Sequence, residues 1–281
     1  MKTLKIILCV ITALSIAAFV LAIYYTQFYK DVIPPQIRMD ADTVTVSVKD
    51  GDEALLRGVT ASDDRDGDLT GAVFVDSVSQ LTGVNSARVR YMVFDGAENY
   101  ASASRTVIYS DYEAPRLSIP QPLIYDVGDT IALRGRVFAR DCLEGNITSM
   151  IRIASPDLNN RVAGVYHLTL WVMNNLGDVS TVSVPVIVRP ADPAAPVVEL
   201  SSYLVYLKQG DRFNPKSYLS AYYESGTSRL RRSYDRLDIA GEVDTDTPGT
   251  YEVTYTATNA EGLSTQVILT VVVEETMEEQ P

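Results

Sequence analysis

One pattern of residues recurs three times along this chain of 281 residues. Each copy opens on a proline, at positions 35, 115 and 196, and then has a Gly-Asp pair, at 51–52, 128–129 and 210–211. Self-similarity at a near-constant interval predicts one structural unit built several times. We therefore expect three small domains, which we call repeat 1 (residues 31–110), repeat 2 (residues 111–190) and repeat 3 (residues 191–274).

A long stretch near the end of each repeat alternates between apolar and polar residues. Alternation with a period of two predicts a β-strand with one face in a core and the other in water. The chain also has 17 Tyr residues against 6 Phe and 1 Trp, and it is rich in Val and Thr, which favours strands over helices. We expect an all-β fold with a two-sheet sandwich in each repeat. The predicted buried positions are Ala87, Val89, Tyr91 and Val93; Tyr166, Leu168, Leu170 and Val172; and Tyr251, Val253, Tyr255 and Ala257.

The linkers between the repeats are short, and the second one, residues 189–196, contains three prolines. A proline-rich linker is semi-rigid. If each repeat is a compact body with a radius of gyration of about 12 Å, it adds about 30 Å to the length of the molecule. The sequence thus predicts a stiff stalk in which each repeat extends the one before it.

The N-terminal segment, residues 1–30, contains 20 uncharged residues from Ile6 to Tyr25. As a helix this run is about 30 Å long, the thickness of the hydrocarbon core of a bilayer. Lys2 and Lys5 precede it, so the positive-inside rule places the N-terminus in the cytoplasm and the repeats outside. The alternative is a signal peptide cleaved after Ala17, but the apolar run continues past that site. We expect an uncleaved single-pass anchor in the cell membrane, and a disordered acidic tail at residues 275–281.

Charge and cysteine content narrow the classes of protein further. The net charge is −12 and the pI is near 4.6, which argues against nucleic acid as a partner. There are two cysteines, and Cys9 lies in the apolar segment, so Cys142 has no partner for a disulfide within the repeats. Secreted eukaryotic sandwiches usually contain paired cysteines, so a bacterial surface fits better.

Repeat 1 contains a motif that is more specific than the strand pattern. It reads Val-Thr-Ala-Ser-Asp at residues 59–63, Arg-Asp-Gly-Asp-Leu-Thr at 65–70 and Tyr-Met-Val-Phe-Asp at 91–95. This strongly resembles the bacterial immunoglobulin-like (Ig-like) domains first named from pesticidal crystal proteins, which are related to hyalin-type repeats. Glu98 stands where that pattern has a glycine before Asn99. Repeat 2 has a weaker version at residues 137–148, and repeat 3 keeps only its proline, its Gly-Asp pair and the strand from Gly249 to Asn259.

The resemblance covers residues 32–274 and implies tandem Ig-like sandwiches on a bacterial surface. Such modules serve as spacers or as ligand-binding units, and they share no catalytic activity. The fold therefore does not settle the function.

The acidic loop of repeat 1 is a candidate calcium site. Asp64, Asp66 and Asp68, together with Asp63, place alternate carboxylates around Gly67, as calcium loops do. The loop lacks the distant bidentate Glu of an EF-hand. The alternative is a tight turn built by Asp and Gly, with Thr70 capping its own backbone. Apart from calcium at this loop, we expect no cofactor.

Two further sets of residues are candidates for binding a partner. Trp171 falls on the predicted outward face of its strand, where it is either a ligand anchor or covered by a neighbouring segment. In repeat 3 tyrosines alternate with arginines, which favours an anionic protein or glycan as the ligand. The alternative is a solvated loop with some of its tyrosines in the core. The candidate residues are Tyr222, Tyr223, Arg229, Arg231, Arg232 and Tyr234.

The sequence offers no catalytic constellation. The one histidine, His167, lies on a predicted strand, and no nucleophile, phosphate loop or Cys/His metal spacing accompanies it. We expect a membrane-anchored, non-enzymatic surface protein that displays Ig-like modules for adhesion or for binding a partner. The alternative is a structural spacer or scaffold that positions a partner complex at the cell envelope.

Overall fold

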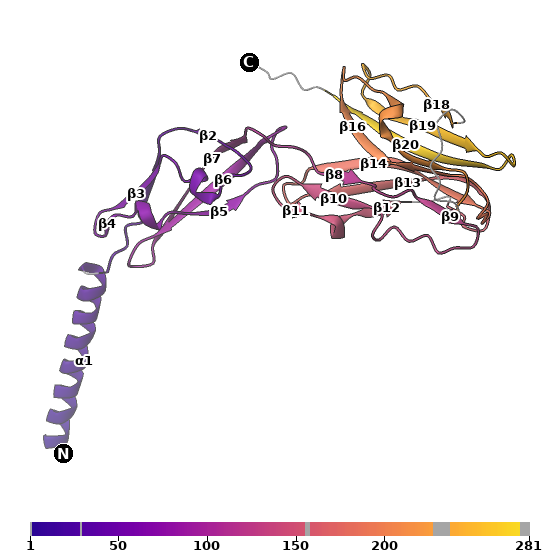
Figure 1. Cartoon of the computed structure of the whole chain (residues 1–281). Helices are drawn as coiled ribbons and strands as arrows, with labels where there is room; N and C mark the ends of the chain where they lie inside the picture. Colours follow the sequence, from indigo (N-terminus) through magenta and orange to yellow (C-terminus); the bar gives the residue numbers. More distant parts are fainter. Residues whose placement is uncertain (1, 29, 155–157, 227–236, 276–281) are drawn as a thin grey trace. The chain divides into compact units, whose positions relative to one another are not determined.

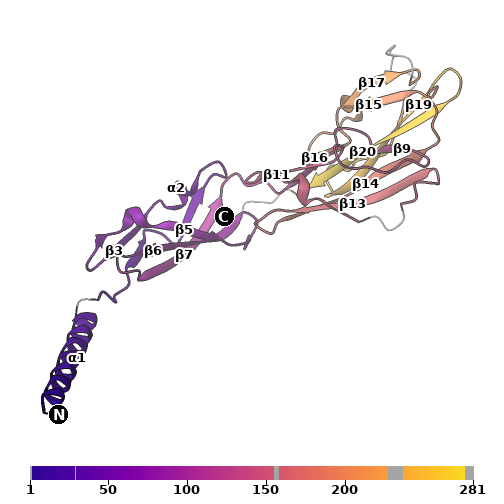
Figure 2. The ribbon, with the colours of Figure 1, turned by 90° about the horizontal axis from the view of Figure 1, so that it is seen from below.

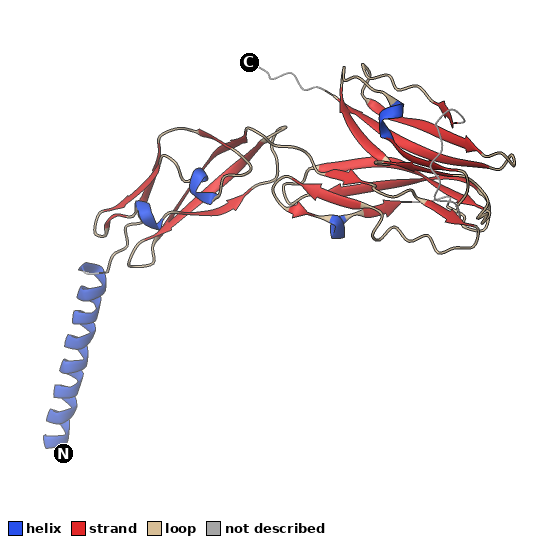
Figure 3. Cartoon of the chain, viewed as in Figure 1, coloured by secondary structure: helices blue, strands red, loops and turns tan. Residues whose placement is uncertain are grey.

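The computed structural model describes residues 2–28, 30–154, 158–226 and 237–275 (Figures 1 and 3). One long helix, α1 (Lys2–Phe28), is followed by strands and a few short helical turns. Within the described residues, α1 is the one helix that is long and apolar enough to cross a membrane, a test that a signal sequence also passes. The predicted acidic tail lies almost wholly outside the described residues.

Repeat 1 is a sandwich of two sheets. One sheet has the order β1-β3-β4, and the other has the order β2-β7-β6-β5, with β2 parallel to β7 and the other pairs antiparallel. The elements are β1 (Gln36–Met39), β2 (Thr43–Val46), α2 (Asp52–Leu55), β3 (Val59–Asp63), β4 (Gly67–Asp68), η1 (Thr70–Ala72), β5 (Phe74–Val78), β6 (Ser86–Phe94) and β7 (Tyr100–Tyr109).

Repeats 2 and 3 follow the same plan. In repeat 2 the sheets are β11-β10-β8 and β12-β13-β14-β9, and in repeat 3 they are β15-β17 and β16-β20-β19-β18. The elements of repeat 2 are β8 (Arg116–Ser118), β9 (Ile124–Asp126), β10 (Phe138–Asp141), β11 (Gly145–Asn146), η2 (Thr148–Met150), β12 (Arg152–Ala154), β13 (Gly164–Met173) and β14 (Val179–Arg189). Those of repeat 3 are β15 (Val197–Leu200), β16 (Leu204–Lys208), η3 (Pro215–Tyr218), β17 (Leu219–Tyr223), β18 (Leu237–Ala240), β19 (Gly249–Thr258) and β20 (Ser264–Glu274).

The all-β fold class and the alternating strands are confirmed. Each repeat contains one long hairpin, β6–β7, β13–β14 or β19–β20, whose first strand is the predicted one. In β6 the four predicted positions have no exposed surface, and in β13 and β19 the last three of the four are buried. Burying one face of a sheet in this way is the main source of stability in a small sandwich. The first positions, Tyr166 and Tyr251, are half-buried at the edge of the core.

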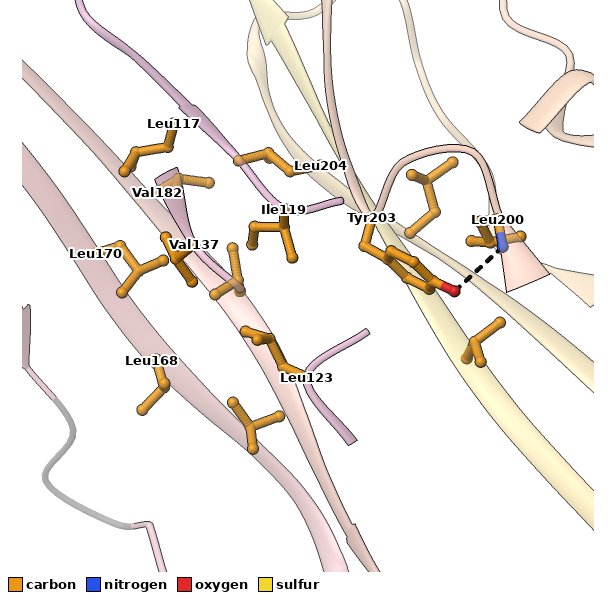
Figure 4. Close-up of a cluster of buried hydrophobic side chains, with 14 of the residues drawn as sticks. Leu117, Ile119, Leu123, Val137, Leu168, Leu170, Val182, Leu200, Tyr203 and Leu204 are labelled. Atoms are coloured by element: carbon orange, nitrogen blue, oxygen red, sulfur yellow. Dashed lines mark hydrogen bonds between the residues drawn. The ribbon is translucent and has the colours of Figure 1, made fainter. Parts of the chain in front are cut away.

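The described structure divides into two compact units, residues 1–112 and 113–281. The second unit holds both repeat 2 and repeat 3. Their buried side chains form one continuous hydrophobic core that includes Leu117 and Ile119 from repeat 2 and Tyr203 and Leu204 from repeat 3 (Figure 4). Figures 1 and 2 both show β14 beside β20, and residues of these two strands contact each other.

Polar contacts reinforce this junction. The backbone N–H of Tyr203 donates to Ile119 O at 2.9 Å, and the Tyr206 hydroxyl accepts from the N–H of Leu117 at 3.2 Å. Arg116 extends over the ring of Tyr206, 5.2 Å from its centroid, and forms an ion pair with Glu274 at 2.8 Å. Desolvation raises the pKa of both Tyr203 and Tyr206.

The expectation of a stalk in which each repeat extends the one before it is wrong for repeats 2 and 3. Pro185 and Ile187 in β14 point away from the core of repeat 2, and they line a narrow crevice with Tyr203 and Ile268 of repeat 3. Apolar side chains on the outer faces of the two long hairpins thus pack against each other, which removes them from water. The prolines of the linker stiffen the connection, but side chains outside the linker determine how the two repeats pack.

Candidate functional site

The acidic loop of repeat 1 has the geometry of a turn. The N–H groups of Arg65 and Asp66 donate to Asp63 Oδ1 at 2.9 and 3.0 Å, and the N–H of Thr70 donates to Asp68 Oδ1 at 2.9 Å. The carboxylate of Asp66 accepts from the N–H of Gly96 at 2.6 Å, and Asp64 is exposed. Local hydrogen bonds of this kind are what Asp supplies in turns.

Asp63 of this loop meets two further carboxylates where β3 and β6 end. One oxygen from each of Asp31, Asp63 and Asp95 lies within 4.8 Å of the other two. Among the described residues this is the one group of three or more acidic, His or Cys side chains close enough to share a metal ion, and Asp64, Asp66 and Asp68 do not form such a group. The structure thus does not bring the predicted residues Asp64, Asp66 and Asp68 together, whereas it places Asp63 with Asp31 and Asp95.

The three carboxylates differ in the hydrogen-bond donors that reach them. Asp95, which is 8% exposed, accepts from the N–H groups of Ala97 and Asn99 and from the Asn99 amide. Asp31, also 8% exposed, accepts from the N–H of Ile33, and its Oδ2 lies 3.8 Å from Arg65 Nε. Asp63 Oδ2 is buried, and no donor in the described part of the chain reaches it.

Asp63 is ionised at neutral pH. The backbone N–H groups of Asp66 and Arg65 donate to its carboxylate and hold its pKa below the usual value, and burial opposes them only in part. The buried oxygen of Asp63 therefore carries negative charge close to two other carboxylates.

A strip of exposed aromatic rings crosses the outer face of the larger sheet of repeat 1. Phe74 in β5, Phe94 in β6 and Tyr100 in β7 are 42%, 46% and 58% exposed. The rings of Phe74 and Phe94 stack with centroids 6.3 Å apart, and those of Phe94 and Tyr100 are 5.9 Å apart. The sequence analysis missed this aromatic strip, although the outward position of Phe94 follows from the burial of Val93 beside it.

Trp171 lies on the outer face of β13 and is 37% exposed. It pairs with Arg152 in β12 and Thr181 in β14, so the larger sheet of repeat 2 flanks it on both sides. His167 is on the same face, where its Nε2 lies 2.9 Å from Glu252 Oε1 of repeat 3. His167 thus contacts repeat 3 while its side chain remains 51% exposed.

The Tyr/Arg stretch of repeat 3 is described only in part. Arg229, Arg231, Arg232 and Tyr234 lie outside the described residues. Tyr223 is half-buried, whereas Tyr222 is 1% exposed and its hydroxyl donates to Thr258 O at 3.4 Å. Tyr222 is therefore a core residue and cannot contact a partner, because the pairing of β17 with β15 places it between the sheets.

Residues 202–273 match the family described as bacterial surface protein, Ig-like domain. Repeat 3 thus matches a bacterial surface Ig-like domain, and repeats 1 and 2 have the same plan of two sheets. The matched segment is repeat 3, in which the sequence motif is weakest, so the Ig-like assignment does not depend on the acidic loop of repeat 1.

Known proteins resemble this Ig-like chain over part of its length. The pesticidal crystal protein Cry22Aa of Bacillus thuringiensis is 30% identical over 130 residues, which is 44% of this chain and 16% of that protein. Among solved structures, a CBM51-2 and INT domain structure of Clostridium perfringens ZmpB with GlcNAc is 18% identical, covering 52% of this chain and 26% of that one, with a TM-score of 0.23. Drosophila N-cadherin EC1-3 is 14% identical, covering 83% of this chain and 98% of that one, with a TM-score of 0.30. At these TM-scores neither structure informs the function of this chain.

Proposed function

We propose that this chain is a single-pass membrane protein that displays its Ig-like repeats outside a bacterial cell and binds a partner there without catalysis. The observation that carries the proposal is the aromatic strip of repeat 1. Large apolar side chains gathered on the surface of a soluble domain mark interaction sites more often than scattered ones do. Aromatic rings also contribute much of the binding energy at interfaces.

The chemistry of the aromatic strip favours a glycan. Its rings project from a sheet, and each of them is at least 42% exposed. The C–H faces of sugar rings pack well on exposed aromatic rings of this kind. The flanking outward positions carry Ser102 and the ion pair between Arg90 and Asp76, at 3.6 Å, which can bond hydroxyl groups. The aromatic strip is formed by uncharged rings, so a partner needs no positive charge to bind there although the protein as a whole is acidic.

A non-catalytic role is consistent with the state of the thiol. Cys142 donates from Sγ to Glu113 O at 3.1 Å, and burial raises the pKa of this thiol, which suppresses the nucleophilic thiolate. His167 is engaged with Glu252 in the contact between repeats 2 and 3.

Protease added to intact cells should digest the repeats and leave an N-terminal fragment in the membrane. The reason is the asymmetry of charge around α1, since Lys2 and Lys5 precede the apolar run. The fragment is detected by an epitope placed before Lys2, with an inverted membrane preparation as the control. A mature chain in the medium that begins near Ala18 would show that the segment is cleaved.

The paired substitution Phe94→Ser and Tyr100→Ser should reduce binding to insoluble cell-wall glycan by about tenfold or more, because both rings belong to the proposed contact. The measurement is co-sedimentation of the full-length chain, in detergent micelles, with purified peptidoglycan. Phe138→Ser is the matched control, since Phe138 is 38% exposed but lies in repeat 2. Equal binding by the paired variant and the parent would place the partner site elsewhere.

A structural spacer is the second candidate, and the shared core of repeats 2 and 3 favours it. Two sandwiches that share one core form a stiffer body than two that are joined only by a linker. If the parent chain does not co-sediment with peptidoglycan, the spacer is the better account.

A further inference from the structure

The buried Oδ2 of Asp63 lacks a hydrogen-bond donor, whereas the equivalent oxygen in repeat 2 has one. Asp141 ends β10 as Asp63 ends β3, and it is 2% exposed. Its Oδ2 accepts from the side-chain amide of Asn174 at 2.9 Å. In repeat 2 the buried negative charge is therefore met by a donor, as a buried carboxylate requires.

Repeat 1 has an aspartate in place of that asparagine. Asp95, Asn174 and Asn259 occupy the same turn, because the backbone N–H of each donates to the carbonyl four residues later. In repeat 3 the amide of Asn259 donates to Ala194 O at 2.9 Å and to Glu224 O at 3.4 Å. A carboxyl group has no N–H, so Asp95 cannot supply to Asp63 the amide N–H bond that Asn174 supplies to Asp141.

We propose that Asp31, Asp63 and Asp95 of repeat 1 hold a calcium ion, which takes the place of the amide donor that repeat 2 uses. The cation accounts for two observations together: three carboxylates within 4.8 Å, and a buried carboxyl oxygen with no donor in the described structure. A turn geometry or an acidic composition alone does not require three carboxylates to lie within 4.8 Å of one another. Nor does it require a buried oxygen without a donor.

The chemistry of the group selects a hard cation. All of the candidate ligand atoms are carboxylate oxygens, and calcium takes six to eight oxygens in a flexible arrangement. Asp31 and Asp95 are nearly buried, so their mutual repulsion with Asp63 is poorly screened by solvent and a divalent ion relieves it. Arg65 is 48% exposed and 3.8 Å from Asp31, too far for a close hydrogen bond, so it neutralises the group only in part.

The ion would join three separate parts of repeat 1. Asp31 precedes β1 and is the third residue after α1, whereas Asp63 ends a strand of one sheet and Asp95 follows a strand of the other. The amide of Asn99 already donates to Asp31 O at 3.3 Å, which holds the segment weakly. Calcium in the medium would therefore fix the first residues after the membrane segment to the sandwich, and calcium loss would release them.

The test measures calcium binding to the full-length chain in detergent micelles by isothermal titration after chelator treatment. The parent should bind one calcium ion with a dissociation constant of about 10⁻⁴ to 10⁻³ M, the range of extracellular modules. Asp95→Asn should weaken binding by about tenfold or more, because it removes one ligand charge. The same variant should be at least as stable as the parent in chelator, since its amide can donate to Asp63 as Asn174 does to Asp141.

Two further variants make the result decisive. Asp64→Asn removes the same charge from the exposed loop outside the group, and it should bind calcium as the parent does. Asp63→Asn keeps an acceptor at Oδ1 and should lose binding, which covers the case in which Asp95→Asn folds poorly. The proposal is overturned if the parent shows no binding at about 10 mM calcium, or if Asp95→Asn and Asp63→Asn both bind like the parent.

Discussion

Replacing Arg105 with Ala is expected to lower the free energy of unfolding of repeat 1 by about 3–5 kcal/mol. Arg105 is 3% exposed in the core between the two sheets. Its Nε donates to the Tyr91 hydroxyl at 2.8 Å and its Nη2 donates to Leu55 O at 2.9 Å and to Arg57 O. Without the guanidinium, Arg57 O and the Tyr91 hydroxyl lose this donor, Leu55 O keeps only the bond from the Tyr91 hydroxyl, and a cavity replaces the side chain.

Hydrogen exchange measured by mass spectrometry on the full chain separates this effect from the other repeats. Peptides from β6 and β7 should lose protection in Arg105→Ala, while peptides from β13 and β19 should not change, because they belong to the other compact unit. Arg90→Ala is the control, since Arg90 is 49% exposed and its ion pair with Asp76 is at the surface. If both variants behave alike, the buried hydrogen bonds of Arg105 do not hold repeat 1 together.

Replacing Tyr203 with Ala is expected to destabilise the unit of repeats 2 and 3 by about 3–5 kcal/mol and to uncouple the two repeats. The ring is 6% exposed in their shared core, and Figure 4 shows it between side chains of both repeats. Its backbone joins them as well, since its N–H donates to Ile119 O and its carbonyl accepts from the N–H of Thr270 at 3.1 Å. Losing the ring exposes apolar side chains on both sides of the junction.

Urea unfolding followed by two probes measures the coupling. Trp171, the one tryptophan, reports on repeat 2, and hydrogen exchange in β19 reports on repeat 3. The two transitions should coincide in the parent and separate in Tyr203→Ala. Tyr203→Phe keeps the ring and loses only the hydroxyl that accepts from Leu200 N at 3.2 Å, so it should cost about 1 kcal/mol and leave the transitions together. Coincident transitions in Tyr203→Ala would mean that other contacts couple the repeats.

The position of Arg105 marks a limit of reading strands from alternation alone. It faces Val89 across the β6–β7 pair, where repeat 2 has Val184 facing Leu168 and repeat 3 has Leu269 facing Val253. From the sequence alone, a charged residue such as this one is predicted to lie at the surface. Only the carbonyls of Leu55 and Arg57, which the chain brings over the sheet, reveal why an arginine belongs there.

The sequence by itself determined the repeats, the all-β class, the buried face of each long hairpin and the apolar length of α1. These features are local, because a strand alternates with a period of two and a membrane-spanning helix needs about 20 apolar residues in one run. The strand pattern and the apolar run can each be read within a window of about twenty residues, and the repeats are found by comparing such windows along the chain, without knowing which segments meet.

The tertiary structure alone decided which side chains meet across long distances in the chain. It brought Asp31, Asp63 and Asp95 together although each is 32 positions from the next in the sequence, and it packed the outer faces of repeats 2 and 3 against each other. Such contacts depend on strand order and register, and a register shift of one residue would turn each side chain to the other face of its sheet. The carboxylate group and the shared core are products of that register, so no local pattern encodes them.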